Sequence, residues 1–427
     1  MFSSSNTLQK SANAYRDISE QFVVDASFLW LLRSISVKQP HYYLEDLAEL
    51  EKRIDANLDG LMCNFELAWD ICLEELSYEQ AGETFSAAII AFRSRNMDKI
   101  QHVVNHAFCN EQTFKGLVSA MAWLPKKLIN EWIERFLYSK DLNHKHLAIA
   151  LCSIRRKSPG DILKELFQRE DCLADTRLLT RLIRLVGELK LYAYGNYLLT
   201  LVEHDVPEVK FWANWSIVML GDHKQVLNLK EYLTEDSLFS PLALQMMFKV
   251  LPIDKARLVI SELAQQPAML RKVIQASGEL GDPHTVPWLI EKMNSFETAK
   301  VAGEAFTLIT GIDLERYELT IDAPEEISVV PNDDNDDENI ELDKDENLPF
   351  PDVNKINHTW LRYRDRYKTG SRYIMGIEVN QNTPATVEKL HNMLKQAGQR
   401  QRYSLALTLA LLDPQSPFVN VKARSLV

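Results

Sequence analysis

Apolar residues recur through the central part of the chain in short helical patterns that are separated by breaks. In VIQASGELGDPHTVPWLIEKM (273–293), an apolar stretch ends at a Gly-Asp pair, and a second stretch with apolar residues three and four apart follows. That spacing places apolar side chains on one face of a helix. The segment NWSIVMLGDHKQVLNLKEYL (214–233) has the same arrangement. The pattern therefore predicts a unit of two helices joined by a turn.

This unit recurs with a period near thirty residues. One apolar residue in the corresponding place marks each unit, and the intervals between successive markers are 32, 30, 35, 31, 31 and 29. The markers are Phe92, Leu124, Ile154, Leu189, Leu220, Leu251 and Leu280. One such pair of helices cannot bury its apolar faces alone, but stacked neighbours can. The sequence therefore predicts an all-α fold, a right-handed α-solenoid of about eight short helical pairs.

The Gly-Asp-Pro cluster within the first segment is predicted to turn the chain rather than to catalyse a reaction. Gly281 follows a helix, where a left-handed residue is common, and Asp282 can cap the next helix. Pro283 suits a first-turn position. Because Pro287 lies too deep for one regular helix capped at Asp282, we expect a short first turn over 282–285 and a regular helix after it. The buried stripe of that helix is expected at Trp288, Leu289 and Met293.

Three further regions frame the predicted repeats. The chain divides into an N-terminal helical cap (1–80), a repeat array (81–320), an acidic segment (321–352) and a C-terminal helical cap (353–427). Within the last region, two predicted helices at 384–397 and 399–412 resemble one more pair in the stack.

The net charge of −12 belongs to the acidic segment. Residues 321–352 hold thirteen Asp and Glu and one Lys, so the rest of the chain carries 47 acids and 47 bases. A neutral body has no overall field to attract nucleic acid or an anionic membrane. The segment has little to pack and is predicted to be disordered, so its deletion should leave thermal stability nearly unchanged.

A calcium-binding loop in this segment is not predicted. In an EF-hand loop that begins at Asp333, Glu338 would replace the required glycine and Lys344 the final glutamate. A solvated run of charge is the favoured interpretation, and a docking site for a basic partner is the alternative.

Cysteine usage and hydropathy favour a cytoplasmic protein without membrane insertion. The five cysteines are scattered and form no CxxC motif, which suits a reducing compartment. The N-terminal residues have no apolar core of a signal peptide. The longest apolar stretches fall far short of the roughly 20 residues that a membrane span needs.

Catalytic, cofactor-binding and metal-ligating residues are not predicted. The motifs GxGxxG, GxxxxGK[ST], GxSxG and HExxH do not occur. His102 and His106 have the i, i+4 spacing of zinc proteases, but Val103 stands where the glutamate base would be, and no third ligand is evident. His144 and His146 point to different faces of a helix.

The segment WLRYRDRYKTGSRY (360–373) mixes basic and aromatic residues. Such mixing can bind stacked bases, but the neutral body disfavours a nucleic-acid partner. It can also form an amphipathic helix whose aromatic side packs on the repeats. A protein-binding surface is favoured, because Arg, Tyr and Trp are enriched in interface hot spots. The predicted partner-binding residues are Trp360, Arg362, Tyr363, Arg364, Arg366, Tyr367, Arg372 and Tyr373.

The repeats resemble a known class. GELGDPHTVPWLIEKM followed by KVAGEAFTLITGIDL (300–314) is similar to the short bacterial form of HEAT repeats. Together with DASFLWLLR (25–33) and AGQRQRYSLALTLALLDPQSPF (397–418), these segments resemble an uncharacterised bacterial HEAT-repeat family that is often encoded beside type VI secretion genes.

The resemblance implies a non-catalytic adaptor or chaperone-like accessory protein for effector loading, with a secretion spike, effector or adaptor as partner. It supplies no catalytic residues. The alternative is a lyase-like or cofactor-binding HEAT-repeat enzyme, since some HEAT-like proteins act on tetrapyrroles.

Overall fold

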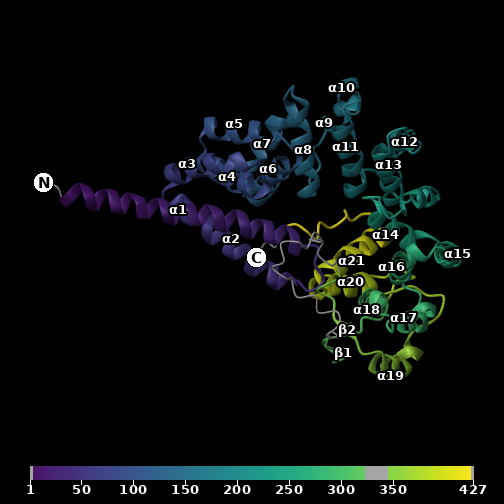
Figure 1. The fold of residues 1–427 in the computed structure, drawn as a ribbon. Helices are drawn as coiled ribbons and strands as arrows, with labels where there is room; N and C mark the ends of the chain where they lie inside the picture. Colours follow the sequence, from purple (N-terminus) through teal and green to yellow (C-terminus); the bar gives the residue numbers. More distant parts are fainter. Residues whose placement is uncertain (1–2, 323–344, 425–427) are drawn as a thin grey trace. The chain divides into compact units, whose positions relative to one another are not determined.

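The computed structural model describes residues 3–322 and 345–424, and most of them are α-helical (Figure 1). Among these residues the strands are four segments of two residues each, so the predicted all-α class is confirmed. The chain forms two compact units. Unit 1 comprises Met1–Leu185 and Asn420–Val427, and unit 2 comprises Val186–Val419.

Unit 1 begins with the helices of the predicted N-terminal cap. They are α1 (Ser3–Ser36), α2 (Leu44–Met62), α3 (Phe65–Glu75) and η1 (Leu76–Tyr78), and α4 (Ala81–Ser94) follows at the start of the predicted repeat array. Helix α1 contacts α2, α3 and α4. Ile54 and Leu58 of α2 are fully buried, and Trp30 of α1 stacks on Phe85 of α4 with ring centroids 5.3 Å apart. Burial of one face of each helix therefore holds these elements together.

The rest of unit 1 continues as short helices. They are α5 (Met97–His106), α6 (Glu111–Trp123), α7 (Lys126–Tyr138), α8 (Leu142–Ile154), α9 (Ile162–Leu166) and α10 (Glu170–Ala174), and then α11 (Thr176–Leu189), within which the unit ends. Helix α4 contacts α6, and α6 contacts α8. Asn96, Asn110 and Asp141 cap α5, α6 and α8 through their side chains, which satisfies free N–H groups at the helix starts. The C-terminal residues join this unit, because Asn420 donates to the Ile154 carbonyl at 3.0 Å.

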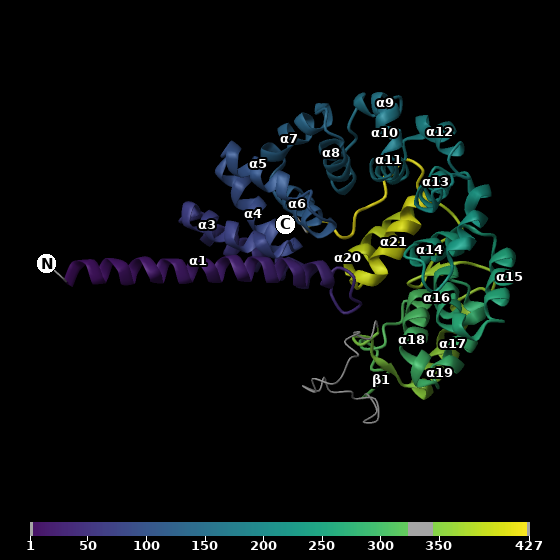
Figure 2. The ribbon, with the colours of Figure 1, turned by 45° about the horizontal axis from the view of Figure 1, so that its top comes forward.

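Unit 2 contains a second series of helices. They are η2 (Tyr192–Tyr194), α12 (Gly195–Leu199), α13 (Pro207–Met219), η3 (His223–Tyr232), α14 (Ser240–Val250), α15 (Ile253–Leu263), η4 (Pro267–Met269), α16 (Leu270–Leu280), η5 (Pro283–Thr285), α17 (Val286–Lys292) and α18 (Phe296–Thr310). Helix α14 contacts α16, and α16 contacts α18 (Figure 2).

The markers of the thirty-residue period fall at helix ends. Each lies in the last turn of a helix or directly after it, at the ends of α4, α6, α8, α11, α13, α14 and α16. The period of about thirty residues is therefore the interval between these successive helix ends.

The predicted turn at the Gly-Asp-Pro cluster is confirmed. Gly281 has a φ of 72°, and the Asp282 side chain accepts a hydrogen bond from the His284 N–H at 3.2 Å. The short turn η5 follows, and α17 begins at Val286. Leu289 and Met293 are buried, and Trp288 is partly buried. The related pair Gly221-Asp222 also has a left-handed glycine, with a φ of 96°.

The prediction of disorder for 321–352 is wrong at its C-terminal end. Residues 323–344 lie outside the described residues. Strand β1 (Thr320–Ile321) pairs antiparallel with β2 (Phe350–Pro351), and Asp345, Leu348 and Phe350 are buried. These residues pack because the acidic run ends in apolar side chains. A deletion that extends to residue 352 would therefore remove buried surface, contrary to the expectation of unchanged stability.

The C-terminal helices also differ from the prediction of one more stacked pair. The remaining elements are α19 (Val353–Tyr363), η7 (Arg364–Arg366), β3 (Tyr373–Ile374), β4 (Ile377–Glu378), α20 (Pro384–Gln396) and α21 (Gln399–Leu412). Helix α21 contacts α20 and α14, and its side chains bond to residues of α16 and α18 (Figure 2). Helix α21 thus lies against α14, α16 and α18. In the described parts of the chain, no helix is both long and apolar enough to cross a membrane.

Candidate functional site

A cavity of about 140 Å³ lies between α14, α16, α18 and α21 in unit 2. Gly278 of α16 allows the close approach that forms one wall, because a Cβ there would lie 3.0 Å from the Cβ of Ala305 on α18. The polar side chains that line the cavity are Gln245, Gln275, Glu279, Glu304, Arg400 and Gln401. We refer to it as the polar cavity.

On one wall of the polar cavity, Glu279 is the acceptor of a buried cluster. Its carboxylate pairs with the Lys249 ammonium at 2.8 Å and accepts hydrogen bonds from Gln245 at 3.0 Å and from the Ser404 hydroxyl at 2.7 Å. The side chains of Lys249 and Glu279 are each only 7% exposed. A buried carboxylate requires such partners, so this cluster fixes α21 against α16.

On another wall, Arg400 of α21 joins two carboxylates. It donates to Glu304 at 2.7 Å and to Asp345 at 3.2 Å, and Asp345 also accepts two hydrogen bonds from Arg271. Burial raises the pKa of Glu304, although Arg400 opposes this shift. Burial alone would also raise the pKa of Asp345, but Arg271 and Arg400 outweigh it, and that pKa lies below its ordinary value. The cluster therefore holds residue 345 beside α18 and α21.

The chemistry available to the polar cavity is limited by its size. A carboxyl group with a shifted pKa and a charged partner is a recognised sign of a functional site. Pockets for drug-sized ligands measure roughly 300–1,000 Å³, whereas this one measures about 140 Å³. It suits water or a ligand of a few atoms.

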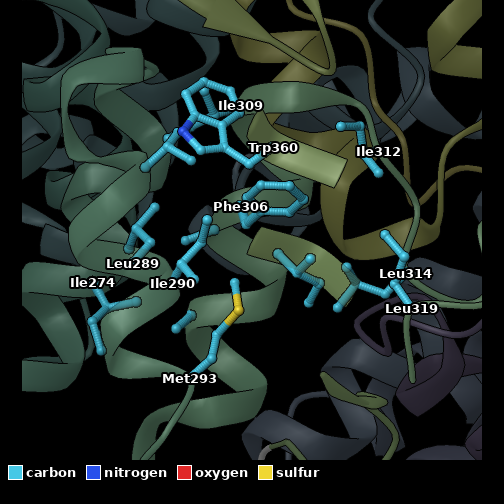
Figure 3. Close-up of a cluster of buried hydrophobic side chains, with 14 of the residues drawn as sticks. Ile274, Leu289, Ile290, Met293, Phe306, Ile309, Ile312, Leu314, Leu319 and Trp360 are labelled. Carbon is cyan, nitrogen blue, oxygen red and sulfur yellow. The ribbon is translucent and has the colours of Figure 1, made fainter. Parts of the chain in front are cut away.

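The aromatic residues of the predicted partner-binding segment pack inside unit 2. Trp360 and Tyr373 are 7% and 5% exposed. Trp360 lies over Phe306 of α18, within a buried cluster from α16, α17 and α18 (Figure 3). The ring of Tyr367 lies between those of Trp360 and Tyr373, with centroids 5.5 and 5.2 Å away. These three rings therefore anchor the segment.

Two polar contacts complete this anchor. The Tyr367 hydroxyl donates to the Thr310 carbonyl at 2.7 Å, and burial raises the pKa of Tyr367. Arg372 donates to the carbonyls of Lys249 and Leu251 at the end of α14. Burial lowers the pKa of Arg372 to about 10, so it stays charged at neutral pH and satisfies carbonyls that a helix end leaves free.

The other four predicted residues form what we call the arginine patch, made of Arg362, Tyr363, Arg364 and Arg366, of which Tyr363 also packs against the buried cluster. The three arginines are exposed and Tyr363 is half-buried. The guanidinium carbons of Arg362 and Arg366 lie 5.6 and 4.6 Å from the centroid of the Tyr363 ring. Cation–π contacts of this kind limit the freedom of the arginines. Arg364 lies 3.9 Å from the neighbouring Asp365.

The eight predicted residues thus divide into two groups. Trp360, Tyr367, Arg372 and Tyr373 support the fold, whereas the three arginines of the arginine patch are exposed. The turn at Gly281-Asp282 also binds this segment, a contact that was not predicted from the sequence. The Tyr373 N–H donates to the Gly281 carbonyl at 2.8 Å, and the Gly370 N–H donates to Asp282 at 3.1 Å.

The histidines named from the sequence have separate surroundings. The rings of His102 and Trp69 form an edge-to-face contact. Burial lowers the pKa of His106. His144 bonds to Ser139 at 2.9 Å, whereas His146 stacks on Phe114. Across the described ranges, no three His, Cys, Asp or Glu side chains lie close enough together to hold a metal ion.

The buried cluster on Glu279 was not found from the sequence, although a signal was present. Lys249 and Glu279 stand 30 residues apart, as do Gln245 and Gln275, and this spacing is close to the repeat period. Polar residues that recur at the repeat spacing inside apolar helices indicate a shared polar site.

Comparisons of the chain with protein-family models, with curated proteins and with solved structures give no match.

Proposed function

We propose that this protein is a non-catalytic protein-binding scaffold, an adaptor or chaperone-like accessory protein for type VI secretion effector loading. The observation that carries the proposal is the arginine patch. Three guanidinium groups are exposed on a segment that Trp360, Tyr367 and Tyr373 fix to the body of unit 2.

The geometry of the patch favours an acidic protein surface as partner. A guanidinium group binds a carboxylate through two parallel hydrogen bonds, which gives both strength and direction. Because Arg362 and Arg366 already rest on Tyr363, less side-chain freedom is lost when a partner binds. Leu361 beside them is 52% exposed and adds apolar surface.

The helix contacts support a HEAT-like α-solenoid as the scaffold. Within unit 1, α4, α6 and α8 touch in order, and within unit 2, α14, α16 and α18 do the same. Contacts between successive repeats are the defining feature of stacked helical pairs. Because α21 covers part of the face formed by α14, α16 and α18, we place the partner on α19 and η7.

The assignment to type VI secretion rests on the sequence resemblance. The segments 273–293, 300–314 and 397–418 are similar to a bacterial HEAT-repeat family encoded beside such genes. The expected partner is a spike, an effector or an adaptor, met in the cytoplasm. The alternative of a tetrapyrrole-binding enzyme gains no support from the polar cavity, since its volume of about 140 Å³ is below that of a pocket for a large cofactor.

The proposal is tested by purifying the tagged full chain from its native host. We expect a protein partner at near-stoichiometric level, and the charge reversal R362E/R364E/R366E should reduce its recovery at least about tenfold, because interfacial charge pairs couple by roughly 1.5 kcal/mol or more. The control K126E/K127E/K140E changes the same charge at exposed lysines of unit 1 and should retain the partner. Recovery of no partner, or equal recovery with both variants, would contradict the proposal.

A further inference from the structure

Helix α1 exposes a stripe of residues with strictly alternating spacing. The exposed positions Asp17, Gln21, Val24, Phe28, Leu31 and Ile35 of α1, together with Lys38 in the turn directly after it, are separated by 4, 3, 4, 3, 4 and 3 residues. The four central positions are large and apolar, and they are 50%, 60%, 48% and 46% exposed in chain order. We call Val24, Phe28, Leu31 and Ile35 the α1 stripe.

The α1 stripe lies opposite the face that packs within unit 1. Residues Val23, Ala26 and Trp30 are buried, and α1 contacts α2, α3 and α4. Helices α3 and α4 lie along one side of α1 in Figure 2, and α2 lies on another side of it in Figure 1. The side chains of the α1 stripe remain exposed beside all three helices. A surface helix is ordinarily apolar on one face only, so a second apolar face indicates a second contact.

The spacing of the α1 stripe specifies the kind of contact. Apolar residues alternately three and four apart form the seam along which two helices pair in a coiled coil. The matching occupant is therefore another helix with the same spacing. We propose that two copies of this protein dimerise through antiparallel pairing of their α1 helices, independently of the arginine patch.

The order of residues along the α1 stripe makes it self-complementary. When Phe28 lies beside Leu31 of the second copy, Val24 lies beside Ile35 of that copy, and every stripe residue gains an apolar neighbour. In the same alignment the turn after α1, which carries Lys38, lies toward Gln21 and Asp17 of the other copy. A parallel alignment would instead place Asp17 beside Asp17, and like charges repel.

The exposed area is sufficient for a reversible dimer. The four side chains are each about half exposed and together present on the order of a few hundred Å² of apolar surface, the size at which exposed patches begin to mark interaction sites. Two copies would bury about twice that area, plus the flanking residues, which is at the lower end for specific interfaces. We therefore expect a weak, reversible dimer.

Sedimentation of the full chain over about 1–100 μM tests the dimer. We expect the mass to rise with concentration toward twice the chain mass of 49.2 kDa. Leu31→Glu should remain at the monomer mass throughout. Leu258→Glu is the matched control, because Leu258 is a leucine on α15 that is 64% exposed, and it should dimerise as the wild type does. A wild-type chain that stays monomeric at 100 μM would overturn the proposal.

Cross-linking tests the orientation and does not depend on a disruptive substitution. In a chain whose exposed Cys63 and Cys109 are replaced by serine, Val24→Cys and Ile35→Cys are made as separate variants. Mild oxidation of the two variants mixed should give a disulfide-linked dimer in several-fold excess over Val24→Cys alone. Linkage of Val24→Cys to itself at an equal level would show parallel pairing, and absence of any linkage would assign the α1 stripe to another protein; either result overturns the proposal.

Discussion

The two Gly-Asp turns of unit 2 use glycine for different reasons. Both Gly221 and Gly281 have positive φ, a conformation that costs other residues roughly 1–2 kcal/mol. At Gly221 no other atom lies within 4 Å of an added Cβ. At Gly281 the added Cβ would collide with the backbone of Tyr373. Only the second glycine is therefore required both for the turn and for the approach of another segment.

This difference predicts unequal effects of one substitution. Gly221→Ala should lower the free energy of unfolding by about 1 kcal/mol, which is the conformational cost alone. Gly281→Ala should lower it by at least about 2 kcal/mol more, because β3 must shift away from the turn. Urea unfolding of both variants measures the difference. Equal losses would show that the Tyr373 contact is easily displaced.

His146 predicts a pH dependence in unit 1. Burial lowers its pKa to about 4, with Arg181 and Arg177 acting in the same direction. An unfolded histidine titrates near 6.5. Between these values the unfolded state binds more protons than the folded state, so stability is lost as the pH falls from about 6.5 to about 4. The loss from this group is on the order of 2–3 kcal/mol.

The substitution His146→Gln isolates this contribution. Its free energy of unfolding should fall less steeply than that of the wild type over the same pH range, because the variant has no proton to bind at this site. Urea unfolding at several pH values between 7 and 4 gives both curves. Parallel curves would mean that His146 titrates alike in the folded and unfolded states.

At the scale of elements, the buried pair of Lys249 and Glu279 joins α14 to α16, and Glu279 also accepts a hydrogen bond from Ser404 of α21. Glu279→Leu should destabilise the protein by about 3–5 kcal/mol, since it leaves the Lys249 charge buried without its partner. The double variant K249M/E279L removes both charges and should recover part of that loss. Urea unfolding of the single and double variants measures both values. If K249M/E279L were no more stable than Glu279→Leu, the unpaired charge of Lys249 would not be the cause of the loss.

The local elements were predictable from the sequence because their causes are local. Gly281, Asp282 and Pro287 determine a helix end, a cap and a delayed helix start within a few residues, and the structure has all three. The placement of α21 was not predictable in this way. It depends on a hydrogen bond between Ser404 and Glu279, which are 125 residues apart in the chain.

The partner-binding segment was predictable in part. Trp360, Tyr363 and Tyr367 recur at helical spacing and mark the side that packs, whereas Arg362 and Arg366 stand four apart on the exposed side. Composition alone does not separate these sides. Arg372 lies beyond the helix, so no periodicity indicated that it binds the end of α14.

At the scale of the whole molecule, the net negative charge is confined to residues 321–352. Outside residues 321–352 the acids and bases are equal in number, so the proposed partner would be recognised by the arginine patch and not by an overall field. Recognition through exposed guanidinium groups weakens as salt screens them, over a Debye length of about 8 Å at physiological ionic strength.

The most direct measurement of the central claim is amine-reactive cross-linking in the native host, followed by mass spectrometry of the purified chain. The exposed lysines Lys355 and Lys368 flank the arginine patch. If the protein is a scaffold that binds its partner through this patch, cross-links to one partner should concentrate at these two lysines and be lost in R362E/R364E/R366E. Partner cross-links confined to the exposed Lys126 and Lys127 of unit 1, or cross-links within the chain alone, would contradict it.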